Sequence, residues 1–380
     1  MLHVGSLSAF AALASPPGVT RRDALGMAAA TGSLAFPRST LAVPSNTATA
    51  AATAPFVVPK LGLGAWAWGD TLFWGYDEKK DSELSEVFDY AVSKGVTFYD
   101  TAEVYGFGRS ETLLGQFASK SSASDQIQIA TKFAALPWRT KASDVVEAAK
   151  KSTDRLGRPI DLYQIHFPNA WANEAYMDGL GDCVDRGLIR AAGVSNYGVE
   201  AVTRCQEKLA SRGVKLTSNQ IQLSLLYPYA LQNGLAAKCD ELGVQVLAYS
   251  PLALGLLTGK YALPDKLPDG PRKPLAQKYL ADPGYEALLA TMRSVGSDHG
   301  GAPPAQIALA WCMAKGASVI PGARTLKQAE SNIAAAQIRL SAKEVLALDG
   351  AAAKVEKVLS PEVNPFPKKD VFTGMQMYDS

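Results

Sequence analysis

The chain has 380 residues, 47% of them apolar, so it can bury a large core either as one barrel with additions or as two domains. A formal net charge of +2 without a concentrated basic segment argues against nucleic acid as a partner. No apolar run is long enough to span a membrane, and four scattered cysteines with only three histidines argue against a metal site.

The first part of the chain, residues 1–54, differs in composition from the rest. It is rich in Ala, Ser, Thr and Pro and carries three arginines but a single acidic residue, Asp23. This composition is typical of a plastid transit peptide. The adjacent Arg21 and Arg22, followed by a weakly apolar stretch, also fit a twin-arginine export signal. We therefore expect a chloroplast protein, in the stroma or the thylakoid lumen, whose targeting segment is disordered or removed and whose residues 55–380 fold.

From about residue 56, short apolar runs alternate with amphipathic stretches of helical periodicity. The expected strands are 61–66, 96–100, 127–132, 160–166, 189–194, 216–222, 244–249 and 317–320, and the expected helices include 81–94, 143–156, 198–212 and 233–242. Eight strand–helix units predict a closed parallel (β/α)8 TIM barrel rather than an open sheet. The last two strands lie roughly twice as far apart as the others, and the prolines between them indicate a long loop.

Polar side chains follow three of these strands directly. Asp100 ends the second strand, Lys132 ends the third, His166 ends the fourth, and Tyr105 lies one short loop after Asp100. Because parallel strands of a barrel end on the same face, these four side chains are expected to share one pocket.

The chemistry of this quartet favours carbonyl reduction. A phenol has a pKa of about 10, and a nearby ammonium lowers it, so Lys132 held by Asp100 would tune Tyr105 as a proton donor. A neutral His166 would hydrogen-bond the carbonyl oxygen that receives the proton. The hydride must come from elsewhere. These residues contain neither a nucleophile paired with its own base nor a metal cage.

The order Asp-x4-Tyr, Lys and His, each following its strand, resembles the aldo-keto reductase superfamily. Further matches, in family order, are 193–196, 218–220, 248–260 and 320–324, so the resemblance covers nearly everything after residue 55. Segments 65–70, 131–139 and 375–378 most resemble the plant and algal plastid-type reductases. The resemblance implies a barrel with an extended loop after strand seven and a C-terminal tail over the mouth. It also implies NADPH-dependent reduction of small aldehydes or ketones by a monomer.

The run Gly106-x-Gly108-x-x-Glu111 is not a dinucleotide fingerprint, because its third position is Glu and no acidic residue follows at the required distance. Its glycines are expected to let the loop turn after Tyr105. The resemblance instead implies that Ser195, Asn196 and Gln220 bind the nicotinamide carboxamide. The full set it places against the cofactor is Trp66, Ser195, Asn196, Gln220, Tyr249, Ser250, Pro251, Leu252, Gly255, Leu257, Lys260, Arg272, Gly322, Arg324, Gln328 and Asn332.

Within that set, Tyr249 would stack on the nicotinamide and Ser250, Leu252, Gly255 and Leu257 would offer backbone groups to the pyrophosphate. Taken singly, the same residues have structural alternatives: Ser195-Asn196 could cap a helix, and Gln220 could simply line the barrel. The long loop after strand seven would fold over the pyrophosphate, with Lys260 and Arg272 on the phosphates; its alternative is surface decoration.

The loop after the eighth strand precedes a helix and offers free N–H groups, and the planar fork of Arg324 suits a phosphate. We therefore predict NADPH over NADH. Many relatives carry Lys-Ser just after the proline and an Arg one turn later, where this chain has Gly322-Ala323 and Gln328. The preference for the phosphate thus depends on Arg324.

Aromatic residues lie in the loops after strands one, three and four. We expect an apolar rim that admits many carbonyl compounds, although some members could simply plug the barrel mouth. The predicted substrate contacts are Trp68, Trp138, Phe167 and Trp171.

Two other functions fit parts of the pattern. A non-catalytic or slow-turnover NADPH-binding, redox-sensing regulator would keep the same site with tightly held cofactor. An aldolase would need Lys132 neutral as a Schiff-base amine, and Asp100 argues against that.

Overall fold

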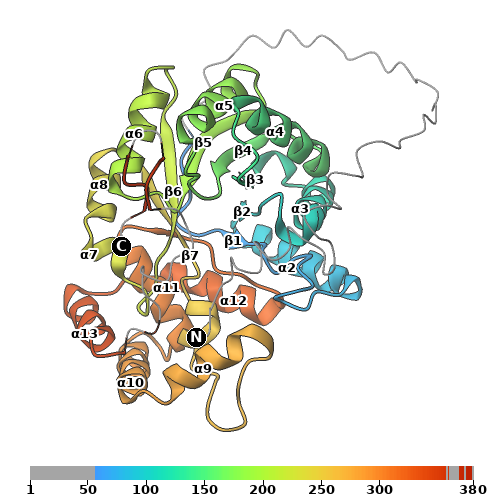
Figure 1. The fold of residues 1–380 in the computed structure, drawn as a ribbon. Helices are drawn as coiled ribbons and strands as arrows, with labels where there is room; N and C mark the ends of the chain where they lie inside the picture. The colour runs from blue at the N-terminus through green and yellow to red at the C-terminus, as the bar shows by residue number, and fades with distance from the viewer. Residues whose placement is uncertain (1–55, 357, 359–367, 372–373, 379–380) are drawn as a thin grey trace, which may run out of the picture. The chain divides into compact units, whose positions relative to one another are not determined.

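Eight short parallel strands surround the centre of the fold, in sequence order (Figure 1). The computed structural model describes residues 56–356, 358, 368–371 and 374–378, so the predicted targeting segment lies outside the described residues. The strands are β1 (Leu63–Gly64), β2 (Phe98–Asp100), β3 (Gln128–Phe133), β4 (Ile160–Ile165), β5 (Ile189–Ser195), β6 (Leu216–Gln222), β7 (Gln245–Tyr249) and β8 (Ser318–Val319). Residues before β1 close the ring, because Gly62 N–H donates to Val319 O and Val319 N–H to Lys60 O, each at 2.9 Å. The predicted parallel (β/α)8 barrel is confirmed.

Helices form the outer layer around these strands (Figure 1). They are α2 (Asp81–Ser93), α3 (Arg109–Lys120), α4 (Ala142–Leu156), α5 (Asn173–Asp185), α6 (Val199–Ala210), α7 (Tyr229–Gln232), α8 (Leu235–Glu241), α12 (Leu326–Ala334) and α13 (Ala342–Ala352). α4 shows why they form: Val145, Ala149 and Leu156 recur at helical spacing and are buried, and Gly157 ends the helix in the left-handed conformation.

The long segment between β7 and β8 contains a loop, residues 259–269, as predicted, and is otherwise mostly helical, which was not predicted. It contains η5 (Ala253–Thr258), η6 (Gly270–Arg272), α9 (Lys273–Leu280), α10 (Pro283–Asp298) and α11 (Pro304–Ala314). Pro274, Pro283 and Pro304 stand in the first turns of α9, α10 and α11, where a missing N–H costs nothing, whereas Pro264 and Pro268 lie in the loop 259–269. At α10, the Asp282 side chain also caps the helix by accepting from Gly284 N–H. Prolines that looked like loop residues therefore mark helix starts.

Inside the barrel, side chains alternate in layers with the period of two of a β-strand. The lower layer is apolar and consists of Phe98, Ala130, Leu162, Ala191, Leu247 and Ile320, all buried. Two residues further along the same strands or the segment after β8 stand Asp100, Lys132, Gln164, Gly193, Tyr249 and Gly322. The barrel interior thus changes from apolar to polar toward the C-terminal strand ends, and we call this second layer, together with Ser218 and Gln220 of β6, the interior polar layer.

Trp68 lies in the core rather than on the rim of a substrate pocket. Its side chain is fully buried, and its Nε1 donates to Ala323 O at 2.7 Å. Its ring centroid lies 6.3 Å from that of Tyr99 and 6.0 Å from that of Phe117. The predicted substrate contact fails here because the chain turns after β1 and directs this indole toward α3 while Trp66 stays at the mouth.

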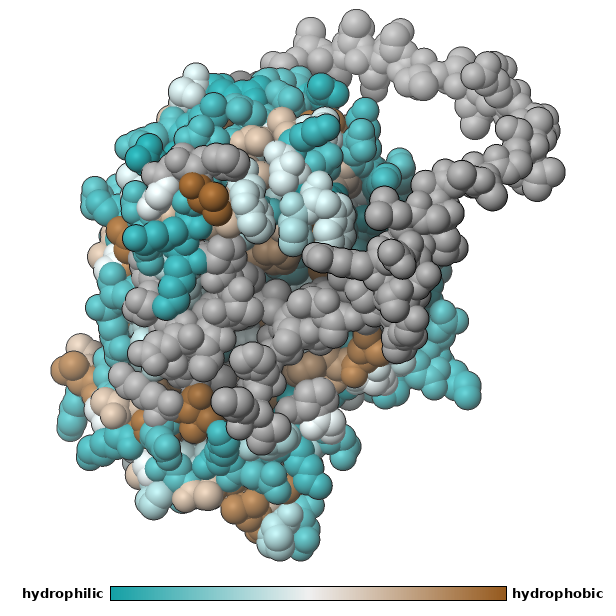
Figure 2. Space-filling model, viewed as in Figure 1, coloured by the Kyte–Doolittle hydropathy of each residue, from teal (hydrophilic) through white to brown (hydrophobic). Residues whose placement is uncertain are grey.

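Hydrophilic residues cover most of the coloured surface on the face shown in Figure 2, and apolar residues appear there only in small groups. The four cysteines are buried and form no disulfide. Among the helices that the structure describes, none combines the length and apolar character needed to cross a membrane.

Candidate active site

The ends of β2, β3 and β4 bring the predicted quartet together. Lys132 Nζ lies 2.5 Å from Asp100 Oδ1 and 3.4 Å from the Tyr105 hydroxyl oxygen. The rings of Tyr105 and His166 meet edge to face, with centroids 5.7 Å apart. All four side chains therefore converge at the C-terminal end of the barrel, where barrel enzymes carry their chemistry.

A tight turn places Tyr105 over Lys132. Tyr105 opens a short 3-10 segment, η3 (Tyr105–Gly108), in which Gly106 has φ 56°. A Cβ on Gly106 would collide with the carbonyl of Gly69, so only glycine allows the two loops to approach this closely. The predicted turning role of these glycines is confirmed.

Lys132 is a fully buried cation that one carboxylate compensates. Its Nζ donates to Asp100 Oδ1 and to Thr101 O at 2.8 Å. Burial lowers the pKa of Lys132, and the neighbouring Asp100 opposes that effect. Because an unpaired charge at this depth costs several kcal/mol, about 3–5 when one partner of a buried pair is removed, neither residue is tolerable without the other.

Tyr105 keeps its proton in this arrangement, which differs from the predicted lowering of its pKa. Burial, and then the negative charge of Asp100, raise the pKa of Tyr105 well above 10. Lys132 Nζ lies closer to Asp100 Oδ1 and Thr101 O, at 2.5 Å and 2.8 Å, than to the Tyr105 hydroxyl, at 3.4 Å. A protonated phenol beside a buried ammonium can donate to an oxygen that gains negative charge.

His166 is neutral, as predicted. Burial and the charge of Lys132 lower the pKa of His166 well below 6.5. Its backbone N–H donates to Phe133 O at 2.9 Å, which fixes the residue at the end of β4. Within the described residues, its buried Nδ1 has no hydrogen-bond partner. The imidazole is thus positioned by its backbone, and its ring remains available to hydrogen-bond an incoming oxygen.

The residues expected around a nicotinamide are linked to this quartet by hydrogen bonds. Ser195, Asn196 and Gln220 are buried. The Tyr249 hydroxyl donates to Asn196 Oδ1 at 2.9 Å, and Asn196 Nδ2 donates to His166 O at 3.1 Å. Gln220 Nε2 donates to Asp100 Oδ2 at 2.7 Å. The two predicted groups of residues therefore form one continuous site.

The loop after β7 holds several residues in an uncommon backbone conformation. Ser250, Ala253 and Leu254 have φ of 49°, 47° and 57°. Such conformations cluster at functional sites because the surrounding structure must hold them. The N–H groups of Gly255 and Leu257 donate to Leu252 O. These two amides, predicted to face a pyrophosphate, thus bond within the loop in this structure.

The remaining predicted residues of that loop, Pro251 and Lys260, differ in placement. Pro251 is buried, whereas Lys260 is exposed with its Nζ 4.9 Å from the centre of the Tyr261 ring. Lys260 can therefore move toward an anion without breaking an ion pair among the described residues.

Two arginines lie against one tryptophan beside the barrel mouth. The guanidinium carbons of Arg272 and Arg324 lie 4.8 Å and 5.4 Å from the centre of the Trp74 ring. Burial, and then the charge of Arg272, lower the pKa of Arg324. Within the described part of the chain, neither guanidinium has a carboxylate within 4.0 Å. Two like charges held close without a counter-ion would be stabilised by a bound anion such as a phosphate.

Gln328, Asn332 and Gly322 shape the loop that carries Arg324. Gln328 Oε1 accepts from Arg324 N–H at 2.8 Å, and Asn332 Nδ2 donates to Gly322 O at 3.2 Å. Both side-chain amides thus bond the backbone of this loop, and Gly322 itself is exposed.

The predicted aromatic rim is only partly assembled. Trp66 stacks on Phe73 with ring centroids 5.0 Å apart and lies 6.1 Å from Tyr105. Phe167 lies 5.6 Å from the His166 ring. The side chains of Trp138 and Trp171 are 65% and 49% exposed, so they belong to the outer part of the mouth.

The C-terminal tail lies across the loops that follow β4, β5 and β6. Val371 N–H donates to Ala170 O, and Gly198 N–H donates to Met377 O. The hydroxyls of Tyr378 and Tyr227 lie 3.2 Å apart. The described part of the tail therefore borders the mouth on the side of Asn196.

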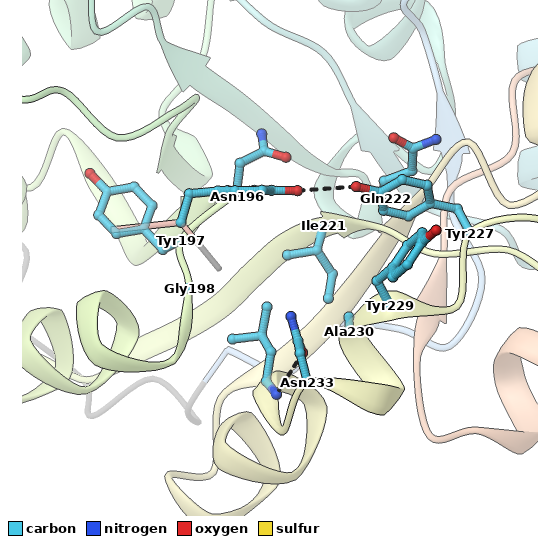
Figure 3. A pocket seen from close by; sticks show the side chains of 11 residues that line it. Asn196, Tyr197, Gly198, Ile221, Gln222, Tyr227, Tyr229, Ala230 and Asn233 are labelled. Carbon is cyan, nitrogen blue, oxygen red and sulfur yellow. Dashed lines mark hydrogen bonds between the residues drawn. The ribbon is translucent and has the colours of Figure 1, made fainter. Parts of the chain in front are cut away.

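A small cavity adjoins this border. Figure 3 shows side chains that line it, among them Asn196, Tyr197, Ile221, Tyr227, Tyr229 and Asn233. Its volume of about 30 Å³ exceeds the roughly 10–15 Å³ that one water molecule needs, and it is too small for a carbonyl substrate. A larger groove of about 270 Å³ lies between α5 and α6 and contains none of the quartet. Neither space is a carbonyl site, because neither is lined by Tyr105 or His166.

Three residues of the site were given no role from the sequence: Glu103, Gln164 and Ser218. Glu103 accepts from Ala134 N–H and Arg139, each at 2.6 Å, and so ties the loop of Tyr105 to the loop of Trp138. Gln164 and Ser218 belong to the interior polar layer. Gln164 could have been predicted from its position two residues before His166, because residues i and i+2 of a strand point to the same face.

The chain matches the model of the aldo/keto reductase family over residues 60–353. It is 39% identical over 320 residues to the chloroplastic pyridoxal reductase of Arabidopsis thaliana, covering 80% of this chain and 86% of that protein. It is also 39% identical over 302 residues to an uncharacterized oxidoreductase of Mycobacterium tuberculosis, covering 78% and 90%.

Solved structures agree with this assignment. A thermostable aldo-keto reductase, Tm1743, crystallised with the inhibitor epalrestat, superposes with a TM-score of 0.63 at 29% identity, covering 77% of this chain and 95% of that one. An aldo/keto reductase from Klebsiella pneumoniae in complex with NADP and acetate gives 0.63 at 23% identity, covering 79% and 93%, and shares the fold. The chain belongs to the aldo/keto reductase family, an oxidoreductase family, which confirms the resemblance.

The neutral state of His166 predicts how stability depends on pH. Because the folded protein holds the pKa of His166 below its unfolded value of about 6.5, the unfolded chain gains a proton first as the pH falls. The contribution of His166 to the free energy of unfolding is therefore fully present above about pH 6.5 and is lost progressively as the pH falls below that value. Urea unfolding of the wild type and of His166→Gln should show a smaller loss in the variant between pH 7 and pH 5. Equal losses would contradict a neutral buried imidazole.

Proposed function

We propose that this protein reduces aldehydes or ketones to alcohols with NADPH, with Tyr105 as the proton donor. The observation that carries the proposal is the contact chain from Asp100 through Lys132 to Tyr105, with the neutral ring of His166 beside the phenol. Carbonyl reduction needs a proton at the oxygen when hydride reaches the carbon, and these residues supply that proton in a water-poor site.

The residues present fit a nicotinamide dinucleotide. Tyr249 offers a ring beside Asn196, the loop 250–257 offers constrained backbone, and the two guanidiniums on Trp74 lack a carboxylate among the described residues. Ser195, Asn196 and Gln220 would hold the carboxamide, and Arg324 with Arg272 would hold the 2′-phosphate. When bound, the cofactor supplies the hydride.

The quartet would orient the substrate and supply the proton. His166 orients the substrate oxygen toward the phenol, and Tyr105 transfers its proton to that oxygen. Lys132, fixed by Asp100, stabilises the phenolate that remains. Burial and the charge of Asp100 raise the pKa of Tyr105, so the phenol carries its proton at neutral pH.

We infer that a planar aromatic aldehyde is the substrate class. Trp66, stacked on Phe73, has its ring centroid 6.1 Å from that of Tyr105, and the ring of Phe167 lies 5.6 Å from that of His166. Flat rings pack well against other aromatic rings. The Arabidopsis relative is a pyridoxal reductase, and pyridoxal is an aldehyde of this shape.

We further infer that the protein acts in the plastid as a monomer. The composition of residues 1–54 and the chloroplastic relative support the compartment. Every residue of the quartet comes from one chain, so catalysis needs no second copy. Amino-terminal sequencing of the mature protein would locate the cleavage site, and gel filtration would give its mass.

The activity itself is tested by NADPH oxidation against a panel of aldehydes and ketones that includes pyridoxal. We expect aromatic aldehydes to be reduced fastest. Tyr105→Phe should lose nearly all turnover, at least about 10²-fold as for a lost general acid, while still binding NADPH. Tyr163→Phe is the matched control, because its buried hydroxyl has no partner among the described residues and lies outside the quartet. Wild-type turnover in Tyr105→Phe would refute the assignment.

The phosphate assignment predicts a cofactor-specific defect. Arg324→Leu should weaken NADPH binding by about 10- to 100-fold, the equivalent of one charge-assisted hydrogen bond, and leave NADH binding within about threefold. Fluorescence titration of both dinucleotides measures this, with Arg339→Leu as a control for loss of an arginine elsewhere. Equal weakening for NADPH and NADH would remove Arg324 from the phosphate site.

A further inference from the structure

Gln164 is a fully buried side chain in the middle of the interior polar layer. It stands on β4, between Lys132 on β3 and Gly193 on β5, because Lys132 pairs with Gln164 and Gln164 with Gly193 in the strand registers. It lies two residues before His166, so both side chains belong to the same face of the strand and its extension. Gln164 therefore lies deeper in the barrel than His166, which stands at the mouth.

The amide of Gln164 connects the quartet to the nicotinamide residues. Its Nε2 donates to Asp100 Oδ2 at 3.3 Å. Its Oε1 accepts from Ser218 Oγ at 3.3 Å and from Gln220 Nε2 at 3.4 Å. Gln220 Nε2 in turn donates to Asp100 Oδ2 at 2.7 Å. Asp100, Gln164 and Gln220 therefore form a closed triangle of hydrogen bonds, with Ser218 attached at one corner.

Gly193 leaves the space that this triangle occupies. A Cβ at position 193 would lie 2.5 Å from Ser218 Oγ and 2.9 Å from Gln164 Cγ. Any larger residue there would displace one of the two side chains. Glycine at position 193 of β5 is therefore required for Gln164 and Ser218 to occupy these positions.

The triangle fixes which end of the Gln220 amide faces the mouth. Both acceptors near Gln220 Nε2, the carboxylate of Asp100 and the oxygen of Gln164, lie within the layer. Because buried donors must be satisfied, the NH₂ group turns toward them and Gln220 Oε1 is left as the acceptor for a ligand. With Gln164 removed, Gln220 Nε2 keeps only Asp100 Oδ2 as an inward acceptor, so the orientation of the amide is held less firmly.

We propose that Gln164, supported by Ser218, is a positioning residue that orients Gln220 so that its oxygen accepts the N–H of the nicotinamide carboxamide. This inference rests on the proposed function. On this proposal the triangle has two roles. It orients Gln220 toward the carboxamide NH₂, and it donates hydrogen bonds to the buried Asp100 carboxylate.

The test compares two cofactors that differ only at the amide. Gln164→Met keeps the size and flexibility of the side chain and removes its hydrogen bonds. We expect the dissociation constant of NADPH, measured by fluorescence titration, to rise by about 10-fold, the scale of one lost hydrogen bond to a buried partner. For the reduced 3-acetylpyridine analogue, which carries a methyl group in place of the NH₂, the rise should stay below about threefold.

Ser218→Ala gives a milder variant of the same triangle and guards against misfolding of the first. It should weaken NADPH binding by a smaller factor with the same selectivity, and the double variant should be no worse than Gln164→Met alone. Gln128→Met, which removes an amide at the start of β3, is the matched control and should bind both cofactors as the wild type does.

Equal weakening for both cofactors, or none in Gln164→Met and Ser218→Ala, would overturn the inference while carbonyl reduction by the wild type stands. If the wild type neither binds nor oxidises NADPH, the proposed function falls, and this inference falls with it.

Discussion

The buried ion pair between Lys132 and Asp100 is the interaction on which the rest of the site depends. A cation with no exposed surface can persist only beside a carboxylate, and that carboxylate needs donors for its second oxygen. Gln220 and Gln164 provide them. The barrel end is therefore not a set of independent residues. The charge of Lys132 requires Asp100, and Asp100 in turn requires two amides from neighbouring strands.

Burial first, and then this same pair, shift the pKa values of both groups that would act on a substrate. The positive charge of Lys132 adds to burial in lowering the pKa of His166, so the imidazole stays neutral. The negative charge of Asp100 adds to burial in raising the pKa of Tyr105, so the phenol keeps its proton. Beside this buried pair of opposite charges, His166 is thus a neutral hydrogen-bonding ring and Tyr105 is a protonated acid. A reductase needs both in these states.

Much of this could be predicted from the sequence, because it depends on strand order. Apolar runs ending in Asp100, Lys132 and His166 suffice to place three polar groups on one face of a parallel barrel. The burial of Trp68 in the core could not be predicted. Trp66 and Trp68 lie in the same loop in the sequence, and only the turn after β1 directs one indole to the mouth and the other to the core. The helices between β7 and β8 were hidden because prolines at helix starts resemble prolines in loops.

The direction of the pKa shift of Tyr105 was also beyond the sequence. It depends first on how deeply the phenol is buried and then on the charge of Asp100, and both follow from the packing of the folded barrel. Gln164 was overlooked for a different reason: a lone glutamine in an apolar strand carries no motif. Its role becomes visible only when β4 is placed between β3 and β5.

A double-mutant cycle on the unfolding free energy of Asp100→Asn and Lys132→Met tests the central interaction most directly. If the pair is the buried interaction described here, each single variant leaves an uncompensated group and costs about 3–5 kcal/mol, and the double variant costs much less than the sum. Urea unfolding of the four proteins gives the coupling. Losses that add to within about 0.5 kcal/mol would show that the two side chains do not depend on each other, and the account of the site would be wrong.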